Sequence, residues 1–209
     1  MKSISVFGAT GSVGTSTLDI IRAFPEKFKV KVLTAHSNWQ KLAELTQEFS
    51  PDTIVISDAR YRHDLAEAVG QDVQVLAGSA GLVEASKIPC DLYMAAIVGI
   101  AGLAPLFAAI DAGNNIALAN KEALVCAGEM LLSAAAEHNV EILPVDSEHN
   151  AIFQVFEQDQ RAALSRVILT ASGGPFRDKE RSELKDITIE QALKHPNWSM
   201  GAKISIDSA

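Results

Sequence analysis

A regular alternation of two kinds of segment constrains the fold of this chain more than any other feature. Between short apolar segments, apolar residues recur at helical spacing, as at Leu42, Leu45 and Phe49. Strands that alternate with helices across short connections predict an α/β fold with a doubly wound, mostly parallel sheet. The strands are continuous apolar runs, as expected when both faces of a sheet are covered. The predicted strands are 3–7, 29–35, 53–56, 73–76, 92–95, 115–119, 141–145 and 166–170.

The pattern changes after Val145. We therefore predict a doubly wound domain at 1–145 and the beginning of an α+β domain at 146–209. Within the second part, Thr188 can begin a short helix with Gln191 completing a capping box, and Pro196 would end it. Residues 203–206 are a candidate further strand.

Composition excludes several classes of protein. The 209 residues carry a net charge of −8 without a long basic run, which argues against nucleic acid as a partner. No apolar run approaches the length of a membrane span, and the start of the chain lacks the shape of a signal peptide. The only cysteines, Cys90 and Cys126, predict free thiols in a reducing cytoplasm.

A glycine-rich turn follows the first predicted strand and opens the first predicted helix, in the segment Gly8-Ala9-Thr10-Gly11-Ser12-Val13-Gly14. Gly8 can make the tight turn, Gly11 lets the backbone approach a pyrophosphate, and Gly14 allows close packing of helix on strand. The free N–H groups of the helix N-terminus then bind phosphate. Three glycines can also be purely structural, but this position favours dinucleotide binding and a Rossmann-like fold.

The end of the second predicted strand bears on the choice of nucleotide. Folds selective for NAD usually place an acidic residue here, against the ribose 2′-hydroxyl. This chain has His36-Ser37-Asn38 and no acid, which favours NADP. Alternatively, these three residues simply cap the next helix.

Two further segments follow predicted strands, at the edge of a parallel sheet where ligands bind. In Asn120-Lys121-Glu122, Asn120 is a good N-cap and Glu122 suits the helix dipole, whereas Lys121 does not, and is either a site residue or a tolerated surface lysine. In Asp146-Ser147-Glu148, the two carboxylates suit Mg²⁺ or Mn²⁺ if the backbone is extended. The alternative is a capped helix start, and the neighbouring His149 is more typical of a structural residue.

The second part of the chain holds fewer signals. Ser172 with Gly173 and Gly174 can form an anion-binding nest or a plain tight turn. His195 and Trp198 lie in a loop flanked by glycine, which indicates a lid over ligand. Otherwise, Trp198 packs against a further domain.

Together these segments resemble one family, the 1-deoxy-D-xylulose 5-phosphate reductoisomerases, and they occur in the order found there. The first motif is generic, whereas Asp-Ser-Glu-His-Asn-Ala-Ile-Phe at 146–153 and His-Pro-Asn-Trp-Ser-Met-Gly at 195–201 are highly specific. The resemblance covers essentially the whole chain. The other segments that carry it are 8–14, 94–99, 119–122, 172–176 and 207–209.

The resemblance implies roles for individual residues. The NADPH site would comprise Thr10, Gly11, Ser12, Val13, His36, Ser37, Asn38, Asn120, Glu122 and Gly201. Asp146 and Glu148 would be ligands of Mg²⁺ or Mn²⁺ and, with Lys121, the catalytic residues. The substrate would contact Lys121, Ser147, Glu148, Ser172, His195, Trp198 and Ser208.

The implied reaction rearranges the carbon skeleton of 1-deoxy-D-xylulose 5-phosphate at a chelated metal and reduces the resulting aldehyde with NADPH, which gives 2-C-methyl-D-erythritol 4-phosphate. Two departures stand out. Ser37 occupies a place that is often basic in the family, and the family's third metal ligand and further phosphate ligands come from a segment beyond Ala209. We therefore expect the chain to bind NADPH weakly to moderately but to turn over poorly or not at all.

The family also suggests a homodimer for the full-length form. Two other functions remain open: a non-catalytic dinucleotide-binding module, and an oxidoreductase of the semialdehyde or homoserine dehydrogenase type. The second of these needs no metal pair such as Asp146 and Glu148.

Overall fold

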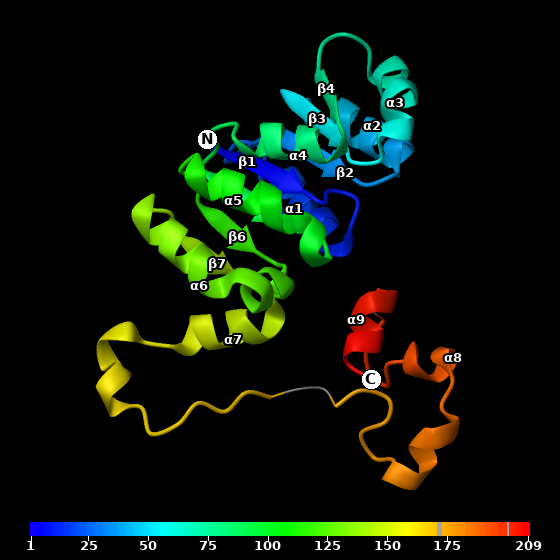
Figure 1. Ribbon diagram of the computed structural model, residues 1–209, viewed down its shortest axis with the longest axis vertical. Helices are drawn as coiled ribbons and strands as arrows, with labels where there is room; N and C mark the ends of the chain where they lie inside the picture. The colour runs from blue at the N-terminus through cyan, green and yellow to red at the C-terminus, as the bar shows by residue number, and fades with distance from the viewer. Residues whose placement is uncertain (171–172, 200) are drawn as a thin grey trace. The chain divides into compact units, whose positions relative to one another are not determined.

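The computed structural model describes residues 1–170, 173–199 and 201–209. Its internal contacts divide the chain into two compact units, residues 1–150 and residues 151–209 (Figure 1). The first unit thus extends slightly beyond the predicted first domain.

The first unit is built on a seven-stranded sheet in the order β4-β3-β2-β1-β5-β6-β7, with every pair of neighbours parallel. This confirms the predicted α/β fold class, and seven of the eight predicted strands lie within about two residues of their observed positions. The strands are β1 (Lys2–Phe7), β2 (Phe28–Ala35), β3 (Thr53–Ile56), β4 (Gln74–Ala77), β5 (Leu92–Ala95), β6 (Ile116–Leu118) and β7 (Ile142–Pro144).

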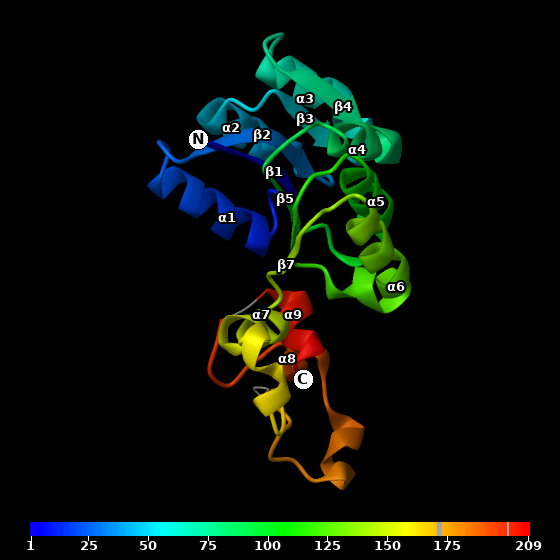
Figure 2. The same cartoon turned by 90° about the vertical axis from the view of Figure 1, so that its left-hand side faces the viewer.

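Helices cover both faces of this sheet (Figure 2). On one face lie α1 (Ser12–Ala23), α2 (Trp39–Phe49) and α3 (Arg62–Val69). On the other lie α4 (Gly78–Ser86), α5 (Leu103–Asp111) and α6 (Lys121–Glu137). The 3-10 helices η1 (Ala59–Tyr61) and η2 (Gly99–Gly102) precede α3 and α5, and α7 (Ser147–Val155) follows β7.

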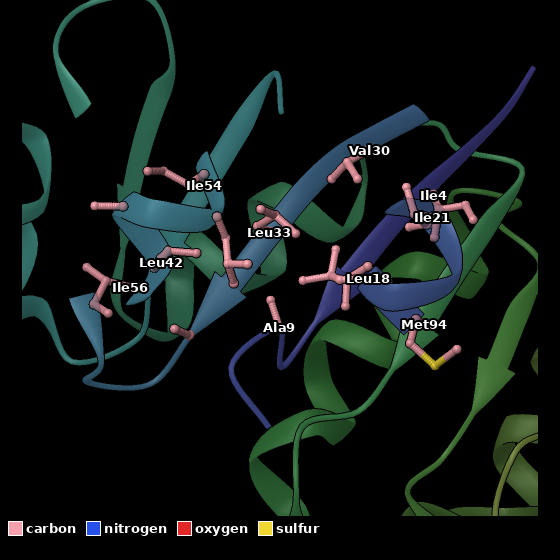
Figure 3. Packing of buried hydrophobic residues seen from close by; sticks show 14 of the residues in the cluster. Ile4, Ala9, Leu18, Ile21, Val30, Leu33, Leu42, Ile54, Ile56 and Met94 are labelled. Atoms are coloured by element: carbon pink, nitrogen blue, oxygen red, sulfur yellow. The ribbon is translucent and has the colours of Figure 1, made fainter. Parts of the chain in front are cut away.

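The two cores arise from the alternation of side chains along each strand. On the first face, Leu18 and Ile21 of α1 pack with Ile4 of β1, and Leu42 of α2 packs among Ile54, Ile56 and Leu33 (Figure 3). On the second face, Phe7 stacks on Tyr93 with ring centroids 4.2 Å apart. Each fully buried large side chain contributes about 1.5–3 kcal/mol, so this packing stabilises the sheet on both faces.

The second unit contains short helices joined by irregular segments: η3 (Gln158–Ala163), η4 (Arg181–Asp186), α8 (Ile189–Ala192) and α9 (Ala202–Asp207). The capping box at Thr188 and Gln191 is confirmed, because each side chain bonds the other residue's backbone N–H. The helix ends at Ala192, however, before Pro196.

Two predicted strands in this unit are wrong. Residues 166–170 have no regular structure, and Val167, Ile168 and Leu169 are 58–70% exposed. A strand needs a hydrogen-bonded neighbour, and in the described part of the chain none pairs with this segment. Residues 203–206 lie instead within α9, where Ser205 is buried.

Within the described ranges, no helix combines the length and the apolar composition that crossing a lipid bilayer requires.

Candidate functional site

The strand order changes direction at β1, which has β2 on one side and β5 on the other. Ligands of open parallel sheets bind beyond the carboxyl ends of the strands at such a point. Gly8 follows β1 directly, with φ at +100°, and a Cβ there would lie 2.6 Å from the Ala96 carbonyl oxygen after β5. Its N–H donates to Thr34 Oγ1 at 2.9 Å, so β2 also anchors the turn. The glycine turn therefore lies at the topological switch point.

The other two glycines have different surroundings. Gly14 is buried in the first turn of α1, and a Cβ there would lie 2.2 Å from the Gly8 carbonyl oxygen and 2.7 Å from Ala9 Cα. Gly11 is exposed at the N-cap of α1, and a Cβ there would meet only Gly8 O, at 3.4 Å. Gly14 thus brings the helix close to the strand, whereas Gly11 leaves the approach to the helix N-terminus open.

The predicted phosphate-binding residues surround that N-terminus. Ser12 is exposed at the start of α1, and Thr10 and Val13 are half-buried on either side of it. The first N–H groups of a helix have no intrahelical acceptor and carry the positive end of the dipole. The site can therefore hold an anionic group without a cationic side chain.

Polar side chains gather at the end of β2. Asn38 Oδ1 accepts from Lys41 N at 3.1 Å and caps α2. His36 Nδ1 lies 2.8 Å from Ser57 Oγ at the end of β3, and Ser37 is exposed between them. Asn38 thus caps α2, His36 and Ser37 lie at the surface, and the role of all three in binding the nucleotide stays a prediction.

Asp58 and Arg60, which sequence reasoning did not single out, lie next to this group. The Asp58 N–H donates to the His36 carbonyl at 2.9 Å, and Asp58 Oδ1 accepts from Arg60 N at 3.2 Å. Arg60 Nη2 donates to Asp58 Oδ2 at 2.6 Å, and this bond lowers the pKa of the Asp58 carboxyl to about 2. The signal in the sequence is an Asp-x-Arg segment that directly follows a predicted strand.

Asn120 occupies the N-cap position of α6, but its side chain makes no capping bond. It is 6% exposed, and its Nδ2 donates to the carbonyls of Ile97 at 2.7 Å and Gly99 at 2.8 Å. Its Oδ1 is buried without a hydrogen-bond partner among the described residues. Asn120 therefore fixes the segment after β5 at the edge of the sheet. Glu122, in the first turn of the same helix, is half-buried and engaged in an interaction of its own.

Lys121 and Asp146 meet at the same edge, after β6 and β7. Lys121 Nζ donates to Asp146 Oδ2 at 2.7 Å, which raises the pKa of the lysine. The Asp146 side chain is 11% exposed, and its Oδ1 is buried with no partner in the described structure. Burial raises the pKa of this carboxyl, but the bond from Lys121 and the contact with Glu148 outweigh that effect, so the pKa is lowered overall. Asp146 is therefore an anion, and the described residues leave one of its oxygens without a hydrogen bond.

The backbone at Glu148 is helical rather than extended. Because α7 begins at Ser147, Glu148 stands in its first turn, and Asn150 Nδ2 donates to the Pro144 carbonyl at 2.7 Å. The backbone of this segment is thus the helix start of the second alternative, and the role of Asp146 and Glu148 as metal ligands stays a prediction. Glu148 is half-buried, whereas Ser147 and His149 are exposed. Within the described ranges, no group of three or more acidic, histidine or cysteine side chains is arranged around one metal position.

In the second unit, His195 and Trp198 form one local structure. Their rings stack with centroids 4.9 Å apart, and His195 Nδ1 accepts from the N–H groups of Asn197 and Trp198. These bonds fix the ring, while Nε2 is buried without a partner in the described part of the chain. Trp198 remains 59% exposed. The His195 ring is thus held in a fixed orientation and stacks on the exposed Trp198 side chain.

Two other segments of this unit meet closely. Gly174, with φ at +61°, lies so near the end of α9 that a Cβ would be 1.9 Å from the Ser208 carbonyl oxygen. Ser208 Oγ donates to the Ser205 carbonyl at 2.9 Å. Gly201 is exposed at the N-cap of α9. The predicted substrate residue Ser172 lies outside the described residues.

Comparison with known proteins gives consistent results. The sequence model of 1-deoxy-D-xylulose 5-phosphate reductoisomerase matches residues 4–128, and that of its C-terminal domain matches residues 142–209. The chain is 50% identical to the reductoisomerase of a Bradyrhizobium strain and 49% identical to that of a Geobacillus strain, in both cases over its whole length. These matches cover 52% and 55% of the two relatives, so the chain spans about half the length of the curated relatives it matches.

Solved structures agree. The Zymomonas mobilis reductoisomerase in complex with NADPH is 46% identical, with a TM-score of 0.90 over the whole chain and 54% of that protein. A reductoisomerase in complex with NADPH, fosmidomycin and magnesium gives a TM-score of 0.92 at 43% identity, again over 54% of its length. Since the family model alone covers more than half of the chain, this protein belongs to the 1-deoxy-D-xylulose 5-phosphate reductoisomerase family.

Proposed function

We propose that this chain supplies the NADPH-binding part and a portion of the metal- and substrate-binding part of a 1-deoxy-D-xylulose 5-phosphate reductoisomerase. The observation that carries the proposal is the placement of the glycine turn and the Lys121–Asp146 pair at one edge of one parallel sheet. A semialdehyde or homoserine dehydrogenase would need the first feature but not the second.

For the nucleotide, the exposed N-terminus of α1 would bind the pyrophosphate through backbone N–H groups at Ser12 and Val13. Asn120 would act by holding the segment 97–99 in place, since its amide is already bonded to that backbone. When bound, NADPH supplies the hydride for the reductive step.

For the metal, the residues present fit a hard divalent cation. Asp146 offers a buried anionic oxygen that has no partner in the part of the chain the structure describes, and Glu148 follows within one helical turn. Mg²⁺ and Mn²⁺ prefer oxygen ligands, and Mg²⁺ in particular usually binds through one or two carboxylates and keeps several waters, so the two carboxylates of this chain match its needs. A bound cation supplies Lewis-acid polarisation of the substrate ketone and adjacent hydroxyl. Lys121 would orient Asp146 and place a positive charge beside the substrate oxygens.

For the substrate, the second unit would bind the phosphate end. His195 has an oriented ring whose Nε2 has no partner among the described residues, and Ser208 lies against Gly174. Trp198 would cover the bound ligand. We further propose a homodimer for the full-length protein, as the family suggests, and a cytoplasmic location consistent with two free cysteines.

The nucleotide part is tested by titrating NADPH into the 209-residue chain and following nucleotide fluorescence. We expect saturable binding that Thr10→Trp abolishes, because the indole would fill the approach to α1. Ile20→Trp is the matched control, since Ile20 is 56% exposed further along the same helix. A folded chain that binds no nucleotide would contradict the proposal.

The metal part is tested by Mn²⁺ titration followed by electron paramagnetic resonance. We expect Asp146→Asn to weaken Mn²⁺ binding at least tenfold, whereas Glu129→Gln, on the exposed surface of α6, should leave it unchanged. Equal binding by both variants would show that Asp146 is not a metal ligand. A chain that binds NADPH but no Mn²⁺ would contradict the metal part of the proposal and leave the nucleotide part standing.

A further inference from the structure

We propose that Arg60 determines the selectivity of this chain for NADPH over NADH by binding the 2′-phosphate of the nucleotide. The inference rests on the proposed nucleotide function. In dinucleotide-binding sheets the ribose 2′-position lies at the end of β2. Here that end presents His36, Ser37 and Asn38 and contributes no arginine, lysine or carboxylate.

The end of β3 brings a charged pair to the same place. The register of β2 with β3 pairs Ala35 with Ile56, and the pairing continues through Ser57 N to Ala35 O and Asp58 N to His36 O, both 2.9 Å. His36 Nδ1 and Ser57 Oγ are 2.8 Å apart. Backbone bonds therefore hold Asp58 beside the end of β2, and Arg60 is held there through its bonds to the Asp58 carboxylate.

Without Arg60, the Asp58 carboxylate would favour NADH over NADPH. A carboxylate near this position accepts hydrogen bonds from a ribose hydroxyl and repels a 2′-phosphate. Asp58, however, is engaged by Arg60 through Nε at 2.9 Å and through Nη2 at 2.6 Å. The Asp58 side chain is only 11% exposed, so Arg60 covers the carboxylate and removes it as a ribose acceptor.

Arg60 itself remains available to a ligand. Its side chain is 81% exposed, and its Nη1 donates to no acceptor within the described ranges. A guanidinium that is already bonded to a carboxylate on one edge can bind phosphate with its other edge and loses little further conformational entropy. Arg60 thus neutralises the Asp58 carboxylate and supplies the positive charge that the end of β2 lacks.

The test compares NADPH and NADH binding by the 209-residue wild-type chain, Arg60→Ala and Arg62→Ala. Arg62 is an exposed arginine two positions along, so its removal changes the net charge equally. We expect Arg60→Ala to weaken NADPH at least tenfold and NADH less than twofold. Arg62→Ala should change both by less than twofold. Adding Asp58→Asn to Arg60→Ala should restore part of the NADPH affinity, because the uncovered carboxylate is gone.

The outcomes distinguish a failure of the proposed nucleotide function from a failure of the proposed role of Arg60. If the folded wild-type chain binds neither nucleotide, the proposed nucleotide function fails. If it binds NADPH and Arg60→Ala keeps the wild-type ratio of NADH to NADPH dissociation constants, only the role of Arg60 is overturned. The role of Arg60 would also be overturned if Arg62→Ala weakened NADPH binding as much as Arg60→Ala does. Arg60→Lys provides a conservative check, with an intermediate NADPH affinity expected since lysine keeps the charge but loses the fork.

Discussion

The strongest prediction concerns the contrast between Gly14 and Gly11. Both lie in the same turn, yet their surroundings differ. A Cβ at Gly14 would be 2.2 Å from the Gly8 carbonyl oxygen, whereas 3.4 Å is the lower limit of an ordinary contact. Its three nearest atoms belong to backbone, so no side chain can rotate away. For Gly14→Ala, helix α1 must therefore move by about 1 Å, against the packing of Leu18 and Ile21.

This displacement sets the expected magnitude. Overpacking of a rigid core typically costs about 1–3 kcal/mol, and we place Gly14→Ala at the upper end, about 3 kcal/mol. For a chain of this size, that corresponds to a decrease in Tm of roughly 6–12 °C. Gly11→Ala adds its Cβ in open surroundings at a φ of −85°, and costs at most about 1 kcal/mol through weaker N-capping.

Gly11→Ala, the variant with the smaller expected loss of stability, should show a large loss of nucleotide binding. Gly11 is exposed where a pyrophosphate would approach, so Gly11→Ala should stay folded but bind NADPH at least tenfold more weakly. The assays are thermal unfolding by circular dichroism and NADPH titration on the same samples. A Gly14→Ala chain that melts within about 2 °C of wild type would refute the close-packing argument. Normal NADPH binding by Gly11→Ala would refute the idea that the pyrophosphate approaches the backbone at Gly11.

Three further predictions concern the first unit. Leu33→Ala should lower the free energy of unfolding by about 2–5 kcal/mol in urea titrations, because Leu33 is fully buried; a loss under about 1 kcal/mol would contradict the packing described. Cys126, which is exposed, should react with iodoacetamide faster than Cys90 when followed by mass spectrometry, since burial raises the pKa of the Cys90 thiol; equal rates would contradict this. The hydrogen bond from Lys31 lowers the pKa of Asp52, so this pair stabilises the fold above the pKa of the unfolded aspartate and the effect is lost as pH falls through the folded pKa. Lys31→Met should therefore cost no more than about 1 kcal/mol at pH 7 in urea titrations, with a difference from wild type that shrinks towards pH 3; a constant difference would contradict the linkage.

Much of the first unit was predictable because its signals are local. Continuous apolar runs and turn residues identify β1 to β7 to within about two residues, and the glycine spacing locates the turn after β1. The capping box at Thr188 likewise depends on residues three apart. Local patterns of this kind also carry the resemblance to the reductoisomerase family, which the comparisons confirm.

Other features depend on which segments become neighbours, and only the tertiary structure decides that. Residues 166–170 have the composition of a strand but pair with no other described segment, since pairing needs a partner that composition does not specify. The use of Asn120 to hold the segment after β5 likewise depends on which segments become neighbours, because its amide bonds the carbonyls of Ile97 and Gly99 instead of capping α6. Arg60 acquires its significance only because strand order brings the end of β3 beside the end of β2. The amino-acid sequence by itself determined the elements of the sheet and the chemical groups at its edge; the order of the strands decided which of those groups meet.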